Sequence, residues 1–155
     1  MPKEKFTVLR SGQEQKNYWT FRLSEHCTGT VQCPLKTGDY TIQGLEDQLC
    51  IERKGCVAEF AGNLTEARFY RELDRMEQFP HCFLLLEFTL EDLLNYPKSA
   101  KLPYSVKRKI KARGPFLLKK LIEIELKYKV KVIFCGDDGQ KVALQILKEV
   151  YYGNA

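Results

Sequence analysis

The protein has 155 residues, the size of one ordinary globular domain with its own core. Hydrophobic residues make up 44% of the sequence and charged residues 29%, a composition that excludes a disordered chain. No apolar run approaches the roughly 18 residues of a membrane span, and the opening sequence MPKEKFTVLR lacks the apolar segment of a secretory signal. We therefore expect an intracellular protein with no membrane partner, in the cytoplasm or nucleoid, or in the nucleus if the source is eukaryotic.

Positive charge is concentrated in one part of the sequence. The whole chain carries 25 Lys and Arg against 20 Asp and Glu, a net charge of +5. Residues 98–131 carry twelve Lys or Arg and two Glu, so this stretch has +10 and the remainder has −5. Such asymmetry favours a polyanion or an acidic partner on one face. A solvated helical surface explains the charge equally well.

The six cysteines indicate reduced thiols rather than a disulfide framework. They form no C-x-x-C pair, and the absence of a secretory signal favours a reducing compartment. A zinc site drawn from His26–Cys27, Cys33 and His81–Cys82 would have a spacing that matches no standard site, so we do not favour it.

The first third of the sequence predicts strands separated by turns. Residues 5–9 are a short β-rich run, and residues 18–23 are typical of a strand or an extended segment. Residues 24–34, with a glycine and a proline, predict a loop. Residues 39–43 and 48–54 flank a turn and predict a hairpin.

The middle of the sequence changes to a helical period. Apolar residues recur at spacings of three and four over 57–78, which predicts an amphipathic helix with a break at Gly62–Asn63. Residues 81–88 are almost continuously apolar and predict a buried central strand. Thr89 is a good N-cap for a short helix that ends at Asn95.

The last third alternates helices with one more strand. Helices are predicted over 104–113 and 115–128, a strand over 130–135 and a final helix over 139–151. The apolar face of the final helix could pack on the sheet or form a dimer contact. Strands followed by helices and returning strands indicate an α/β domain whose mixed central sheet is flanked by helices.

One group of charged residues in the predicted hairpin could carry chemistry. Asp39 starts one strand, and Glu52 lies near the end of the next, where it shares a face with Lys54. If the hairpin pairs Asp39 near Glu52, two carboxylates and one ammonium converge. Two hard oxygen ligands suit Mg²⁺, and the lysine can orient a water or stabilise developing charge, as phosphodiester hydrolysis requires. Charged residues at strand ends are common, so the triad alone is a weak signal.

Three longer segments of the sequence resemble a known family, and this resemblance is more specific than the triad alone. The segments SGQEQKNYWTF (11–21), GDYTIQGLEDQLCIERKGCVAEFAGNLTEARFYREL (38–73) and FPHCFLLLEF (79–88) resemble the nuclease domain of the XPF/Mus81/Hef structure-specific endonucleases, also called the ERCC4 domain. That family has a Gly-Asp, a Glu-Arg-Lys after a strand, and a buried strand that ends in Glu. The resemblance implies a restriction-endonuclease-like α/β fold.

The resemblance also implies roles for individual residues. Asp39 and Glu52 match the metal ligands of the family, with Mg²⁺ or Mn²⁺ as the cofactor. Lys54 matches the catalytic lysine, and Arg53 matches the motif arginine, expected on substrate phosphate or on active-site carboxylates. Glu14 matches an upstream acidic position that contributes to the metal site.

Some positions depart from the family pattern. The early Asp and Arg of the family are Ser11 and Gln13 here. The acidic residue usually four positions after the lysine is Ala58, although a match anchored on the following Gly-Asn-Leu places Glu59 there. We therefore expect Glu59 as an accessory carboxylate and Arg68 as an accessory arginine that faces the DNA or the site.

The resemblance leads to expectations about organisation and partners. We expect one ERCC4-type nuclease domain over 1–155, without the helix-hairpin-helix module of eukaryotic members, and either a homodimer or a complex with a partner protein. The basic stretch would contact DNA phosphates. The cations expected to do so are Lys107, Arg108, Lys109, Lys111 and Arg113. Tyr104 among them could stack on an unpaired base, although a core tyrosine is the simpler interpretation.

Two functions fit these expectations. The first is a metal-dependent DNA endonuclease that hydrolyses phosphodiester bonds, with branched, flap or fork junctions as substrate. The alternative is a catalytically silent, nuclease-like module that binds DNA or scaffolds a partner, which the departures at Ser11 and Ala58 motivate.

Overall fold

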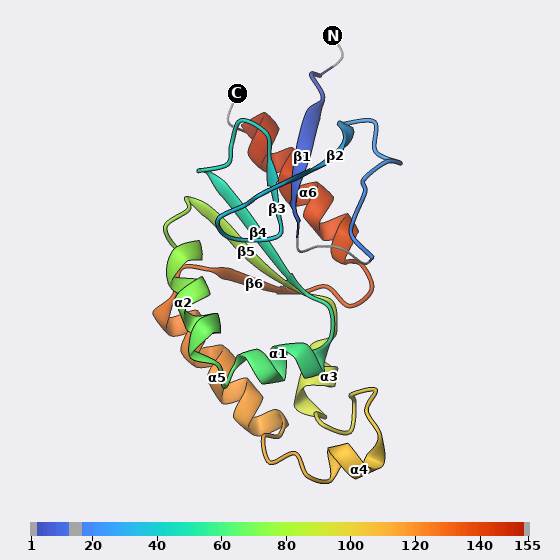
Figure 1. Ribbon diagram of the computed structural model, residues 1–155, viewed down its shortest axis with the longest axis vertical. Helices are drawn as coiled ribbons and strands as arrows, with labels where there is room; N and C mark the ends of the chain where they lie inside the picture. The colour runs from blue at the N-terminus through green and yellow to red at the C-terminus, as the bar shows by residue number, and fades with distance from the viewer. Residues whose placement is uncertain (1–2, 13–16, 154–155) are drawn as a thin grey trace.

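The computed structural model describes residues 3–12 and 17–153, and its centre is a six-stranded sheet (Figure 1). The strands are β1 (Phe6–Ser11), β2 (Cys27–Cys33), β3 (Tyr40–Ile42), β4 (Leu49–Lys54), β5 (His81–Leu86) and β6 (Lys131–Phe134). Their order across the sheet is β2-β1-β3-β4-β5-β6. β3 pairs antiparallel with both β1 and β4, whereas the pairs β1–β2, β4–β5 and β5–β6 are parallel. The predicted mixed sheet and the predicted hairpin are confirmed.

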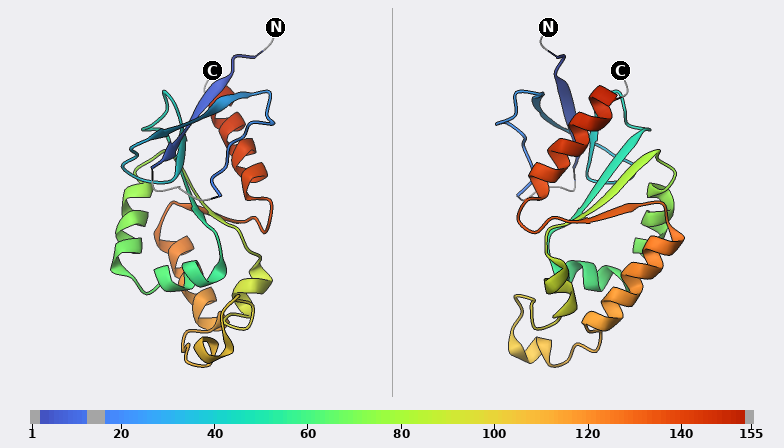
Figure 2. Two further views of the ribbon diagram at one scale, coloured as in Figure 1. Left: turned by 45° about the vertical axis from the view of Figure 1, so that its right-hand side comes forward. Right: turned by 180° about the vertical axis from the view of Figure 1, so that it is seen from behind.

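Helices cover both faces of this sheet. They are α1 (Val57–Asn63), α2 (Ala67–Met76), α3 (Leu90–Leu94), α4 (Tyr104–Lys107), α5 (Gly114–Lys127) and α6 (Gly139–Gly153). Figure 2 shows α6 on one side of the sheet and α2 and α5 on the other. This arrangement confirms the expected α/β architecture of a mixed sheet flanked by helices.

The two faces of the central strands bury apolar side chains in separate cores. Ile51 and Leu85 pack in a core with α6, whereas Cys50 and Leu84 pack in a core with α1, α2 and α5. Successive residues of a strand point to opposite faces, so both faces of β4 and β5 must be apolar. This is why residues 81–88 form an almost continuous apolar run.

Local signals set two of the helix boundaries. The break predicted at Gly62–Asn63 is confirmed, since α1 ends at Asn63 and α2 begins at Ala67. At the start of α3, the Thr89 hydroxyl accepts a hydrogen bond from the Asp92 N–H at 3.1 Å, and the Asp92 carboxylate accepts one from the Thr89 N–H at 2.9 Å. This reciprocal capping box satisfies two amides at the helix N-terminus.

The final helix packs on the sheet, as one of the two interpretations of its apolar face predicts. Ala143, Ile146, Leu147 and Val150 are buried in the α6 core. These residues recur at spacings of three and four, so they form one face of the helix. The sheet therefore accounts for this face.

The prediction of a loop over 24–34 is wrong. β2 occupies Cys27–Cys33 and pairs parallel with β1 at the edge of the sheet. An edge strand gains its stability from backbone pairing on one side, and this one buries only its first residue, so its sequence lacks an alternating pattern. Residues 18–23 form an irregular segment that ends in a turn, with Phe21 at a positive φ, rather than a strand.

The helix predicted over 104–113 is much shorter than expected. α4 covers only Tyr104–Lys107, and Tyr104 is 80% exposed, so the interpretation of a core tyrosine is wrong. The large apolar residues of this stretch are Tyr104, Val106 and Ile110. They are too few for the broad apolar stripe that holds a helix against a core.

The cysteines and the helix lengths complete the description. None of the six cysteines, all of which lie in described positions, forms a disulfide, and Cys27, Cys50, Cys82 and Cys135 are buried. Within residues 3–12 and 17–153, no helix has both the length and the apolar character needed to cross a membrane.

Candidate active site

The turn before β3 fixes Asp39 beside β4. Gly38 has φ of +84°, and a Cβ there would lie 2.6 Å from the Cys50 sulfur, so both conformation and space require glycine. The N–H of Asp39 donates to the carbonyl of Ile51 at 2.8 Å. The Asp39 carboxylate in turn accepts a hydrogen bond from the backbone N–H of Arg53 at 2.9 Å. The hairpin therefore holds this carboxylate against the start of the Glu-Arg-Lys motif.

Glu52 and Lys54 project from one face of β4 and are almost entirely buried. Each is 7% exposed. Together with Asp39 they line a cavity of about 440 Å³, to which α1 contributes Glu59 and α2 contributes Arg68. Of the predicted site residues, Asp39, Glu52, Lys54, Glu59 and Arg68 line this cavity, and Arg53 borders it although its guanidinium contacts Glu87. Glu14 lies outside the described residues.

The sequence reasoning missed one carboxylate, Glu72 on α2. Burial raises the pKa of Glu52 well above its ordinary value, and hydrogen bonding with Glu72 and the charge and hydrogen bond of Asp39 raise it further. Arg68, Glu72 and Arg75 all line the cavity. Their spacing of four and three residues places them on one face of α2, and this periodicity was the signal that could have identified Glu72.

Lys54 is held by contacts on both sides of its ammonium. Its Nζ lies 4.0 Å from a carboxylate oxygen of Glu59 and 5.3 Å from the centre of the Phe69 ring. The other Glu59 oxygen accepts a hydrogen bond from the N–H of Gly55 at 3.1 Å. Glu59 therefore occupies a position next to the lysine, although the family pattern falls on Ala58.

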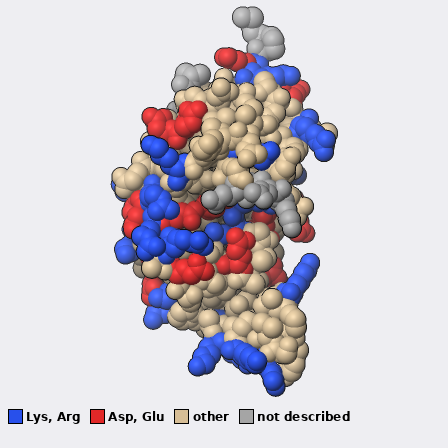
Figure 3. All heavy atoms as spheres, in the orientation of Figure 1, with Lys and Arg blue, Asp and Glu red and all other residues tan. Residues whose placement is uncertain are grey.

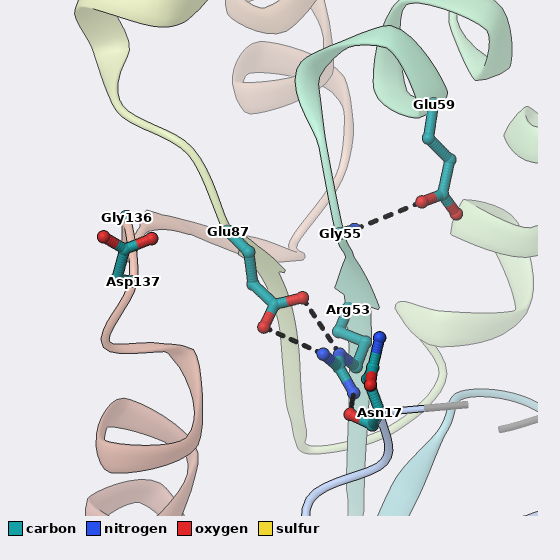
Figure 4. A pocket seen from close by; sticks show the side chains of 7 residues that line it. All are labelled: Asn17, Arg53, Gly55, Glu59, Glu87, Gly136 and Asp137. Atoms are coloured by element: carbon teal, nitrogen blue, oxygen red, sulfur yellow. Dashed lines mark hydrogen bonds and ion pairs between the residues drawn. The ribbon is translucent and has the colours of Figure 1, made fainter. Parts of the chain in front are cut away.

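Arg53 projects to the opposite face of β4. Its guanidinium forms two hydrogen bonds with the Glu87 carboxylate, at 2.9 and 3.0 Å (Figure 4). A further N–H donates to the Asn17 carbonyl at 2.9 Å, and the guanidinium carbon lies 4.2 Å from the centre of the Trp19 ring. Asn17, Arg53 and Glu87 border a second cavity of about 420 Å³. Of the two placements expected for Arg53, the structure shows a carboxylate contact, but with Glu87 rather than with the carboxylates beside Lys54.

The donor set of the first cavity suits a hard divalent cation. Asp39, Glu52 and Glu72 supply carboxylate oxygens, and crowding of these like charges is what a cation would relieve. Among the described residues, no group of three or more His, Cys, Asp or Glu side chains is arranged as a metal cage. Mg²⁺ needs no such cage, since it keeps several waters and is commonly held by one or two carboxylates and a substrate phosphate. Asp39 and Glu52 are therefore sufficient as protein ligands.

The cations predicted to contact DNA lie away from the cavity. Lys107, Arg108, Lys109, Lys111 and Arg113 belong to α4 and the segment that follows it, and none of them lines the cavity that contains Glu52. Figure 3 shows Lys and Arg at the tip of the molecule formed by this segment, and no Asp or Glu there on the visible face.

Comparisons with known proteins identify the fold and the family of the chain. No curated protein matches the chain. Two solved structures, "XPF from Aeropyrum pernix" and the same protein in complex with DNA, have TM-scores of 0.66 and 0.67 at 18% sequence identity. The matches cover 94% and 97% of this chain but only 61% and 66% of those chains, so this sequence spans less than their full length. A family model described as ERCC4 domain matches residues 9–143, and the chain therefore belongs to the ERCC4 domain family.

Proposed function

We propose that the protein is a Mg²⁺- or Mn²⁺-dependent DNA endonuclease that hydrolyses phosphodiester bonds. The observation that carries the proposal is the convergence of Asp39, Glu52 and Lys54 in one polar cavity, where the side chains of Glu52 and Lys54 are buried. Membership of the ERCC4 domain family and the likeness to XPF, which has been solved with DNA, support it. Branched DNA with a flap or fork is the proposed substrate.

Each residue of the cavity has a distinct part in this reaction. Asp39 and Glu52 hold the cation, which when bound lowers the pKa of a coordinated water and neutralises charge on the scissile phosphate. Lys54 donates a hydrogen bond to the attacking water or to the phosphoryl oxygens, where negative charge increases in the transition state. Glu59 restrains the Lys54 side chain. Arg53 ties β4 to the residue that follows β5 through its contact with Glu87, and the bidentate contact fixes the orientation of the guanidinium.

The alternative is a silent module with the same fold. Ser11, which replaces the early Asp of the family, lies in the lining of the cavity, so one expected carboxylate is replaced by a hydroxyl there. Ala58 lies on α1, where it packs against the apolar core and supplies no oxygen ligand. A cation held by fewer carboxylates binds more weakly, and this favours a role in DNA binding or scaffolding.

Incubation of purified protein with labelled flap, fork and duplex DNA in Mg²⁺, Mn²⁺ or EDTA separates the two functions. The proposal predicts cleavage of a branched substrate that needs the metal and is lost in Asp39→Asn. Binding of branched DNA that is sensitive to salt, without cleavage in either metal, would support the silent module instead.

The remaining expectations stay predictions. They are assembly as a homodimer or with a partner protein, a single nuclease domain, and an intracellular location. Sedimentation of the purified chain, alone and with DNA, tests the first of these.

A further inference from the structure

A compact basic lobe extends from the helical layer, far along the chain from the catalytic hairpin. We define the α4 lobe as residues 97–113; it contains seven Lys or Arg and no Asp or Glu. The ion pairs found in the described part of the chain involve none of these cations. Six of the seven cations are exposed. A surface with several exposed cations attracts a polyanion, because several of its charges can be neutralised together.

The lobe is anchored at both ends, so its exposed face is held in place. The N–H of Gly114 donates to the carbonyl of Tyr96 at 3.0 Å, and a Cβ at Gly114 would overlap the Leu94 carbonyl. Leu102 and Ile110 are partly buried against the core. Inside the lobe, the Lys107 ammonium donates to the carbonyl of Lys98 at 3.1 Å.

Two exposed apolar side chains stand among these cations. Tyr104 is 80% exposed and Val106 is 44% exposed. An exposed aromatic ring within a basic lobe suits a ligand that has a flat apolar face and negative charge, because contact with the ring removes apolar surface from water. An unpaired nucleotide has both, since its base can stack on the ring and its phosphates can meet the lysines. A base paired within a duplex has no free face to offer.

We propose that the α4 lobe is a second nucleic-acid contact, which holds an unpaired strand by stacking a base on Tyr104. Arg108, Lys109 and Lys111 neutralise the phosphates on either side of that base. The lobe would thereby favour DNA that has a single-stranded arm. This inference rests on the proposed action on DNA, but it makes a claim about binding that does not depend on cleavage.

The test is fluorescence anisotropy in EDTA, with a labelled single-stranded oligothymidine of about 20 nucleotides and with a hairpin duplex; the strand exceeds one stacking site. Tyr104→Ala should weaken binding of the single strand by roughly five- to 100-fold, the range for loss of one base–aromatic stack. Binding of the duplex should change by less than about twofold, because backbone contacts dominate there. Tyr104→Phe should keep the affinity of the wild-type protein, because it keeps the ring.

Matched variants separate the lobe from general effects. Leu126→Ala removes a side chain that is 83% exposed on α5 and should leave both affinities unchanged. Lys109→Ala should reduce the slope of log affinity against log salt for the single strand by about 0.7, whereas Lys141→Ala on α6 should not. Circular dichroism verifies that each variant is folded.

The outcomes distinguish this inference from the proposed function. If Tyr104→Ala weakens single-strand and duplex binding equally, or weakens neither, the stacking site is wrong while the nuclease proposal stands. If the wild-type protein binds neither DNA in EDTA, the stacking site is wrong, and metal-dependent cleavage of flap DNA still decides the nuclease proposal. An acidic peptide that binds as tightly as the oligothymidine, with the same loss in Tyr104→Ala, would identify the lobe as a protein-docking surface and overturn the inference.

Discussion

The two faces of β4 use the same three-residue motif for different purposes. On one face, Glu52 and Lys54 enter a cavity beside α2, where burial, together with the neighbouring carboxylates, raises the pKa of Glu52. On the other face, Arg53 is paired with the Glu87 carboxylate and lies over the Trp19 ring. The first face buries a carboxylate among other carboxylates, and the second has a charge pair with matched hydrogen bonds.

This difference teaches that neighbours in a motif need not share a site. Alternation along a strand sends Arg53 away from the two residues that flank it. A group whose charge is already paired can stabilise the fold, whereas a group destabilised by burial and like charges is suited to a cation. We expect substitutions on the first face to affect chemistry, and substitutions on the second face to affect stability.

The largest effect is expected for the carboxylates of the first face. Asp39→Asn and Glu52→Gln should each lower the rate of DNA cleavage by roughly 10³-fold or more, because a metal in this role supplies several kcal/mol of transition-state stabilisation. Single-turnover cleavage of a labelled flap measures the loss. Asp47→Asn, an exposed acid in the same hairpin, is the matched control and should cleave normally. Cleavage at the wild-type rate by Glu52→Gln would place the active site elsewhere.

The next effect concerns the lysine. Lys54→Met keeps most of the buried stem and removes the charge, so cleavage should fall by about 10²- to 10⁴-fold while Mn²⁺ binding persists. Glu59→Gln should lower the cleavage rate by less than about tenfold, since the Glu59 side chain is 48% exposed and its 4.0 Å ion pair with Lys54 is weak. Mn²⁺ binding is followed by electron paramagnetic resonance. Equal losses in the two variants would mean that Lys54 acts only as the partner of Glu59.

Substitution on the second face should reduce stability. Arg53→Ala leaves the Glu87 carboxylate without its bidentate partner at 17% side-chain exposure, so the free energy of unfolding should fall by about 2–4 kcal/mol. The double variant Arg53→Ala/Glu87→Gln should recover part of this loss. Urea unfolding measures both. If Arg53→Ala keeps its stability but loses cleavage, the arginine contacts the substrate and the division between the two faces is wrong.

The smallest effect is a pH dependence of stability in the metal-free protein. Because the pKa of Glu52 is raised in the folded state, the folded protein binds more protons than the unfolded chain above the ordinary carboxyl pKa. Stability should therefore fall as pH rises from that value toward the raised one, by up to about 1.4 kcal/mol per pH unit. Thermal unfolding compares wild-type protein with Glu52→Gln, which should lack this component. A wild-type slope identical to that of Glu52→Gln would contradict the raised pKa.

The sequence predicts the parts of the fold whose residues are buried on a regular pattern. The hairpin, the break at Gly62–Asn63 and the strand at 81–88 follow from apolar spacing and turn residues, and all are confirmed. β2 was missed because an edge strand is specified by backbone pairing with β1 rather than by its own side chains. The sequence overestimates the length of α4, because a run of cations is typical of a helix surface even where no apolar stripe lies on the opposite side.

In the candidate site, too, the sequence predicts local contacts but not contacts between distant segments. Asp39, Glu52 and Lys54 could be placed together from local hairpin geometry alone. Glu72 joins the site through packing of α2, and Glu87 reaches Arg53 on the opposite face through pairing of β5 with β4, which are contacts between distant segments. In a single sequence, such contacts are visible only as an acidic residue on a helix face or after a strand. Acidic residues at these positions are too common for a role to be assigned to any one of them.

The position of the cation tests the central claim most directly. Crystals soaked in Mn²⁺ and measured at the manganese absorption edge would show an anomalous peak wherever the ion binds. The account predicts a peak roughly 2.1 Å from carboxylate oxygens of Asp39 and Glu52. No peak in that cavity at saturating Mn²⁺, in crystals of protein that cleaves DNA, would contradict it.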